Sequence, residues 1–212
     1  MATVWRATVA VALAVAVLGG AGCDSLPAGR VAALHGTPHP SRVILLRGWR
    51  GLYSSGVNDL AAKLRARGVD AIVYRHDQWR DVAAAVPPGA DVTLVGFSYG
   101  ADDAIRLADR LGKRGVRVPL LVTIDPVTPP PVPEAVGRCV NYYQSNGVMD
   151  VLPWLRGVPV RGPRVTNFDL RTGRKDLLRP DTSHATIAGH AKLHDEIVRL
   201  IVDAPAASGT LR

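Results

Sequence analysis

Apolar runs and segments of helical periodicity alternate along this chain. Four short runs rich in valine, isoleucine and leucine predict buried strands, at residues 42–46, 69–74, 92–97 and 116–124. Segments that repeat apolar residues at helical spacing predict the helices between them, at residues 55–67, 78–86 and 101–111. Further along we expect a strand at residues 138–144, a strand at 158–170 broken around Gly162-Pro163, and one helix from 185 or 187 to about 202.

Strands that alternate with helices predict an α/β fold. The expected sheet is mostly parallel, has about six strands and carries helices on both faces, because parallel strands need crossover connections. A chain of 212 residues is long enough for one domain with a substantial core, which we place at residues 42–203. Residues 204–212 are rich in alanine, proline, serine and glycine, and we expect a flexible tail there.

The first 22 residues have the pattern of a signal peptide. Arg6 gives a short positive region, residues 7–18 form an apolar run, and residues 19–22 are small. The apolar run is too short to cross a bilayer as a helix. We therefore expect export, followed by a tether at residues 23–41.

Ala21-Gly22-Cys23 resembles the lipobox of bacterial lipoproteins, with Gly20 where that family usually has leucine. The resemblance implies that Cys23 is lipidated and tethers the protein to a membrane. Asp24 would, by the same resemblance, keep it on the periplasmic side of the inner membrane. The alternative is an ordinary secretory peptide cut near Ala21, which would leave a soluble periplasmic or secreted protein.

Composition narrows the classes of function. The chain is 47% hydrophobic and 21% charged, as expected for a globular protein, and only 5% aromatic, which argues against a base-stacking nucleic-acid surface. The net charge of +8 is spread along the chain, so we read it as a solvated face and expect no nucleic-acid partner. Weak attraction to anionic membranes is the alternative. Cys139, in an apolar run, is expected to be a small core residue.

Gly96-Phe97-Ser98-Tyr99-Gly100 joins a predicted strand to a predicted helix. A serine on so sharp a turn adopts strained backbone angles, and small neighbours two residues away let the turn fit. The start of the helix then faces developing negative charge. This G-x-S-x-G pattern predicts Ser98 as a nucleophile; the alternative is a plain turn with a solvated serine.

A serine nucleophile needs a histidine base, and His184 stands where we expect one. It lies after the last predicted strand and just before the closing helix. The remaining five histidines are assigned no catalytic role: His35 and His39 in the tether, His76 in a surface loop, and His190 and His194 on the closing helix. The last two are four residues apart, but they lack a glutamate between them and a third ligand, so we expect no metal and no cofactor.

Two aspartates compete for the role of the acid that orients His184. Asp125 ends an apolar strand and precedes Pro126, whereas Asp150 follows the next predicted strand. We favour Asp125 because its position at a strand end is clearer, and Asp150 stays open. For the oxyanion we expect the backbone N–H groups of Tyr99 and Trp49.

Together these motifs resemble the α/β-hydrolase superfamily over residues 42–203. The resemblance rests on Leu45-Leu46-Arg47-Gly48-Trp49, on the serine motif, on Ile124-Asp125-Pro126 and on Ser183-His184, in that order. Many members have His-Gly where this chain has Arg47-Gly48. The chain looks like the compact bacterial esterases, thioesterases and lipases that lack a cap domain.

The resemblance implies a serine hydrolase that cleaves an ester or thioester through an acyl-enzyme intermediate. The leader makes it an exported one, and we expect a small-molecule or lipid acyl ester as substrate. Short connections leave no room for a lid, so we expect an open site. Two alternatives remain: a catalytically silent envelope lipoprotein that binds a lipid or glycan on the same scaffold, and an acyltransferase with the same residues.

Overall fold

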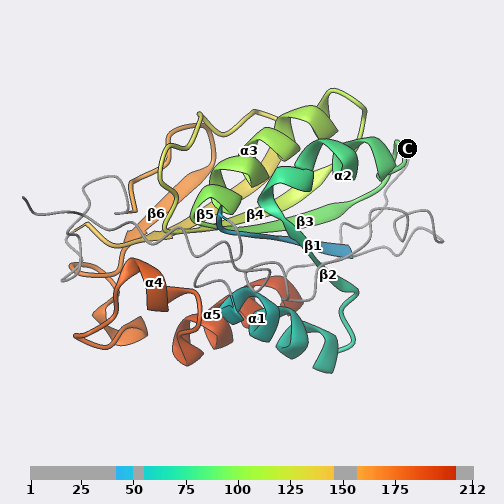
Figure 1. Ribbon diagram of the computed structural model, residues 1–212. Coiled ribbons are helices and arrows are strands. Elements are labelled where there is room, and N and C mark those ends of the chain that lie inside the picture. The colour runs from blue at the N-terminus through green and yellow to red at the C-terminus, as the bar shows by residue number, and fades with distance from the viewer. Residues whose placement is uncertain (1–41, 50–54, 146–156, 204–212) are drawn as a thin grey trace, which may run out of the picture.

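Six parallel strands form one sheet in the order β2-β1-β3-β4-β5-β6 (Figure 1). The computed structural model describes residues 42–49, 55–145 and 157–203. The strands are β1 (Arg42–Arg47), β2 (Ala71–Arg75), β3 (Val92–Phe97), β4 (Val118–Ile124), β5 (Val136–Tyr143) and β6 (Val165–Asp169). The prediction of an α/β fold with about six strands is confirmed, and every strand pairing is parallel.

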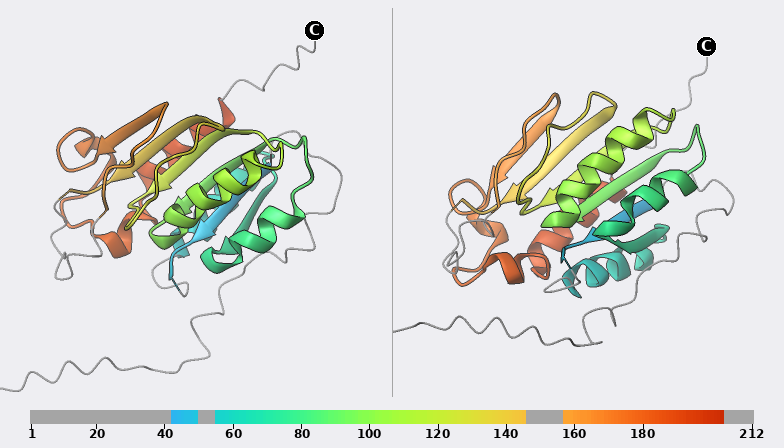
Figure 2. Two further views of the ribbon diagram at one scale, coloured as in Figure 1. Left: turned by 90° about the horizontal axis from the view of Figure 1, so that it is seen from above. Right: turned by 45° about the horizontal axis from the view of Figure 1, so that its top comes forward.

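Helices cover both faces of the sheet (Figure 1). The helices are α1 (Ser55–Ala66), α2 (Trp79–Ala85), α3 (Tyr99–Gly112), α4 (His184–Ile187) and α5 (Ala191–Val202), with short 3-10 turns η3 (His76–Gln78) and η5 (Lys175–Leu177). Helices α2 and α3 lie across one face, and α1, α4 and α5 lie across the other, as the views in Figure 2 also show. The predicted two-sided covering is therefore present.

The alternation of side chains along β1 shows why its sequence is apolar throughout. Val43 and Leu45 belong to the core on the α1 and α5 side, whereas Ile44 and Leu46 belong to the core under α2 and α3. A strand covered on both faces buries every side chain, which removes the polar positions that a half-exposed strand would show. Cys139 on β5 lies fully buried in the second core, as predicted.

The sheet order reverses direction between β1 and β3. From β1 the chain continues outward to β2, and from β3 it continues in the opposite direction to β6. In open α/β sheets the connections diverge at such a point and leave a crevice beyond the carboxyl ends of the strands. Ser98 follows β3 directly, so the predicted nucleophile stands at this crevice.

The prediction of one closing helix is wrong, because two helices occupy that stretch. Helix α4 ends at Ile187, and α5 begins at Ala191. Between them, Gly189 N–H donates to Thr186 O (3.0 Å) and His190 N–H donates to Ile187 O (3.1 Å), which are tight turn contacts rather than helical ones. Gly189 within the apolar pattern weakens the helix and allows this break.

The predicted broken strand at residues 158–170 contributes only its second half, as β6. The side-chain amide of Asn167 bonds both backbone groups of Val160, accepting from its N–H (2.8 Å) and donating to its carbonyl (2.9 Å). These bonds satisfy the backbone of Val160 without a neighbouring strand. Residues 157–161 therefore run beside the sheet instead of joining it.

Several predictions concern residues outside the described ranges. They are the signal peptide at 1–22, the tether at 23–41 with Cys23, the alternative acid Asp150, and the tail at 204–212. Among the helices that the structure does describe, none combines the length and apolar character needed to cross a membrane.

Candidate active site

Ser98 sits on a strained turn between β3 and α3. Its backbone angles are φ 57° and ψ −129°, a conformation that L-residues rarely adopt. The Ser98 N–H donates to Ile124 O (2.9 Å), which ties the turn to the end of β4. The turn therefore presents the hydroxyl at the carboxyl edge of the sheet, as the G-x-S-x-G pattern predicts.

The two glycines of the motif are required by close packing. A Cβ atom on Gly96 would lie 2.3 Å from Gly100 O, and one on Gly100 would lie 2.4 Å from Arg47 O. Both contacts are with backbone, which cannot move aside as a side chain can. Larger residues would push the turn away from β1, so the spacing of the motif follows from packing around Ser98.

His184 connects the serine to an acid. Its Nε2 atom lies 2.9 Å from Ser98 Oγ, and its Nδ1 atom lies 3.0 Å from Asp125 Oδ2. The imidazole ring stacks on Phe97, with ring centroids 5.3 Å apart, and this contact supports its orientation. A nucleophile, a base and an orienting acid thus form one hydrogen-bonded series.

Asp125 is almost completely buried, at 1% exposure, and is supported by amide donors. The backbone N–H of Gln144 donates to its Oδ1 atom (2.8 Å), and the side-chain amide of Gln144 donates to Oδ2 (3.2 Å). These bonds replace the water that a carboxylate loses on burial. Because Asp150 is outside the described residues, the choice of Asp125 as the acid stays a prediction, now with a geometry that fits it.

Asp102, in the first turn of α3, holds the segment that follows Asp125. Its carboxylate accepts from the N–H groups of Val127 (3.1 Å) and Thr128 (2.8 Å), and from Thr128 Oγ1 (3.1 Å). Burial raises the pKa of Asp102, and the hydrogen bonds from Thr128 and Val127 oppose that shift. The nucleophile helix and the loop after the acid are therefore joined directly.

The predicted oxyanion donors lie at the ends of neighbouring strands. Tyr99 is the first residue of α3, where backbone N–H groups have no partner within the helix. Trp49 follows β1, and its side chain is 53% exposed, so the ring does not pack in the core. Their role in oxyanion binding stays a prediction.

His76, expected to be an idle surface histidine, has a specific partner. Its Nδ1 atom lies 2.8 Å from Asp103 Oδ2, while Arg106 donates to Asp103 Oδ1 (2.8 Å). Its ring centroid is 6.3 Å from that of Tyr99, beside the serine turn. Sequence reasoning missed this pair because Asp103 is 27 residues away and carries no local signal.

His190 and His194 do not share a helical face, because His190 precedes α5. His194 is buried and its Nε2 donates to Ala188 O (2.6 Å); burial lowers its pKa, and the hydrogen bond to Ala188 opposes that shift. In the parts of the chain that the structure describes, no three histidine, cysteine or acidic side chains are grouped so as to hold a metal ion.

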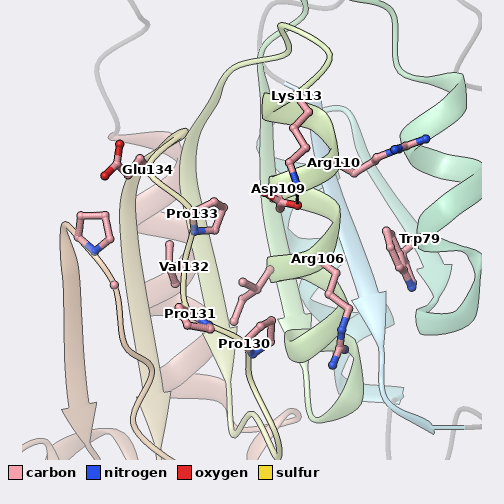
Figure 3. Close-up of a pocket in the computed structure, with 13 residues that line it drawn as sticks. Trp79, Arg106, Asp109, Arg110, Lys113, Pro130, Pro131, Val132, Pro133 and Glu134 are labelled. Atoms are coloured by element: carbon pink, nitrogen blue, oxygen red, sulfur yellow. Dashed lines mark hydrogen bonds and ion pairs between the residues drawn. The ribbon is translucent and has the colours of Figure 1, made fainter.

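A groove of about 660 Å³ lies away from these residues, on the face covered by α2 and α3. Figure 3 shows Arg106, Asp109, Arg110 and Lys113 projecting from α3, with Trp79 on one side and the prolines at 130, 131 and 133 on the other. Ser98, His184 and Asp125 are not among its lining residues. The groove is thus separate from the candidate active site.

No protein-family model and no curated protein sequence matches this chain. A function therefore has to be argued from the residues of the site and their geometry. The observation that says most about possible chemistry is that hydrogen bonds connect Ser98, His184 and Asp125.

Proposed function

We propose that this protein is a serine hydrolase of the α/β-hydrolase superfamily that cleaves an ester or thioester through an acyl-enzyme intermediate. The observation that supports it best is that one imidazole lies within hydrogen-bond distance of both Ser98 Oγ (2.9 Å) and Asp125 Oδ2 (3.0 Å). A serine on a strained strand-to-helix turn, at the point where the sheet order reverses, adds support.

The reaction would begin with Ser98 attacking the carbonyl carbon of the substrate. His184 Nε2 takes the hydroxyl proton as the Oγ–carbon bond forms, and later returns a proton to the leaving alcohol or thiol. The carboxylate of Asp125 stabilises the imidazolium through Nδ1–H, without itself becoming protonated. Water activated by His184 then cleaves the acyl-enzyme and restores the serine.

The negative charge on the carbonyl oxygen needs donors placed before the reaction begins. The N–H of Tyr99, at the start of the 14-residue helix α3, is the donor that the strand-to-helix turn at Ser98 favours. The N–H of Trp49, after β1, is proposed as the second. Backbone donors need no reorganisation as charge develops, which is why they stabilise a transition state more than a substrate.

The proposed substrate class is a small or lipid acyl ester in the cell envelope. The leader at residues 1–22 supports export, and Cys23 supports a lipid anchor on the periplasmic side of the inner membrane. A site without a cap, which the short connections in the sequence predict, would admit flexible acyl chains from the membrane surface. Transfer of the acyl group to an alcohol instead of water would use the same residues.

The test is labelling of the purified protein with a fluorophosphonate probe, which reacts with an activated serine. We expect wild type and His76→Ala to be labelled, and Ser98→Ala and His184→Ala to be unlabelled. His76→Ala is the matched control, because it removes a histidine that also bonds an aspartate beside the same turn.

Failure of the wild-type protein to label, with circular dichroism showing a folded α/β protein, would overturn the proposal and favour a silent binding protein. Labelled protein would then be tested on an ester panel with and without added alcohols. Products formed only in the presence of the alcohol would identify an acyltransferase.

A further inference from the structure

Arg171 joins two segments that carry different members of the candidate triad. Its guanidinium donates to Gln144 Oε1 (2.5 Å), just after β5, and to the backbone carbonyls of Thr182 and Pro180 (3.2 Å to Pro180 O). Thr182 and Pro180 lie in the loop that leads into His184. A single planar cation therefore links the support of Asp125 to the loop that precedes His184.

Gln144 carries this connection to the acid. Its side chain is buried, at 2% exposure, and its two ends have different partners: Oε1 accepts from Arg171, and Nε2 donates to Asp125 Oδ2 (3.2 Å). Because Arg171 can only donate, it requires the oxygen of the amide to face it. The amide nitrogen must then face Asp125, which needs a donor.

The segment between β6 and His184 is also held at its beginning. Asp169, the last residue of β6, accepts from the backbone N–H of Arg171 (2.9 Å). The backbone of Arg171 is thus fixed to the sheet while its side chain reaches across to the histidine loop. An unbroken path of hydrogen bonds runs from Arg171 through Gln144, Asp125 and His184 to Ser98.

We infer that Arg171 and Gln144 are positioning residues for the proposed hydrolysis. They act through Asp125 and His184 and do not bond Ser98. Arg171 sets the orientation of the Gln144 amide and the position of the His184 loop together, so that the carboxylate and the imidazole stay within hydrogen-bond distance. The inference rests on the proposed function, since it names what keeps that site assembled.

The main test compares Arg171→Ala with Arg174→Ala. Arg174 is the matched control: it lies three residues on, and its guanidinium bonds Asp176 and Glu196, neither of which belongs to the path. On a short-chain p-nitrophenyl ester we expect Arg171→Ala to lower kcat about a hundredfold with KM little changed, since a misplacement of about 1 Å at a reacting centre can cost on that order. Arg174→Ala should keep wild-type kcat.

Chemical rescue separates positioning from general loss of structure. Guanidinium ion, at concentrations that leave the melting temperature unchanged, should restore part of the kcat of Arg171→Ala, and urea, a planar but neutral analogue, should not. Equal kcat in the Arg171 and Arg174 variants, or no rescue by guanidinium in a folded variant, would overturn the inference.

Gln144→Glu provides a second variant if Arg171→Ala does not fold. Glutamate keeps the shape and the oxygen that faces Arg171, but it replaces the donor to Asp125 with a second carboxylate oxygen. We expect a loss of kcat on the scale of Arg171→Ala, with KM again little changed. Wild-type kcat in Gln144→Glu would overturn the inference, whereas a wild-type protein that neither labels nor hydrolyses would overturn the proposed function.

Discussion

The molecule contains two histidine–aspartate pairs of similar geometry beside the serine turn. His184 Nδ1 lies 3.0 Å from Asp125 Oδ2, and His76 Nδ1 lies 2.8 Å from Asp103 Oδ2. Both aspartates are buried, Asp125 at 1% and Asp103 at 9% exposure. By distance and burial alone, either pair fits a base with its orienting acid.

The pairs differ in their remaining partners. The second ring nitrogen of His184 faces Ser98 Oγ, and Asp125 is otherwise supported by the neutral amides of Gln144. Asp103, in contrast, already pairs with the cationic Arg106. A carboxylate shared with a permanent cation has less of its charge to offer an imidazolium. A functional base therefore needs a nucleophile on one side and an acid supported by neutral donors on the other.

The largest expected effect is the loss of the reaction in His184→Ala. We expect kcat/KM on the best ester to fall by about 10⁴-fold or more, because the proton of Ser98 then has no acceptor. His76→Ala should keep kcat/KM within about tenfold of wild type, since His76 has no place in the proton transfer. A comparable loss in both variants would contradict the distinction between the two pairs.

Replacement of each acid by asparagine should distinguish the two pairs nearly as clearly. Asp125→Asn is expected to lower kcat by about 10³- to 10⁴-fold, because the amide cannot stabilise the imidazolium. Asp103→Asn should leave kcat near wild type. The same kinetics on Asp150→Asn would decide between the two candidate acids: a loss there as large as in Asp125→Asn would contradict our choice of Asp125.

Asp103→Asn should instead affect stability. The ion pairs with His76 and Arg106 are partly exposed, so their loss should lower the free energy of unfolding by only about 1 kcal/mol. Urea titration of the variant and the wild type measures this difference. A wild-type free energy of unfolding, with kcat lowered a hundredfold, would place Asp103 in the catalytic machinery.

The smallest effect concerns His194, which bonds a carbonyl instead of a carboxylate. Its folded pKa is lowered from 6.5 by burial, so the unfolded state binds a proton more readily. The stability that neutral His194 contributes is therefore complete above pH 6.5, and it is lost as the pH falls through the lowered pKa. Urea titrations at pH values on either side of 6.5 should show that the free energy of unfolding depends less on pH in His194→Gln than in wild type.

The sequence predicts β1, β3 and β4 well because they are buried on both faces and read as nearly continuous apolar runs. It fails where tertiary contacts decide local structure. A helical apolar pattern continues through Gly189, but the chain turns there, and the Asn167 amide takes the backbone bonds that a strand at residues 158–161 would have used. Such contacts do not change the periodicity of apolar residues, so the sequence pattern cannot predict them.

For the site, the order of motifs predicts Ser98, His184 and Asp125, and the structure brings these three together. The contacts around them escape sequence reasoning because each joins residues distant in the chain: Gln144, which supports Asp125, is 27 residues from Arg171, and Asp103, in the neighbouring pair, is 27 residues from His76. Glutamine and arginine are also common on protein surfaces, so their types gave no signal.

The hydrogen bond between Ser98 and His184 joins residues 86 apart in the chain, and His184 precedes α5. That helix lies against α1, where Lys63 and Asp195 form an ion pair (3.0 Å). The serine therefore has its base only when α4 and α5 are packed in place, with α5 against α1. A chain that ends before residue 184 would carry Ser98 without its base, so we expect its serine not to react with the probe. The rate of probe incorporation during refolding would then report when His184 reaches Ser98.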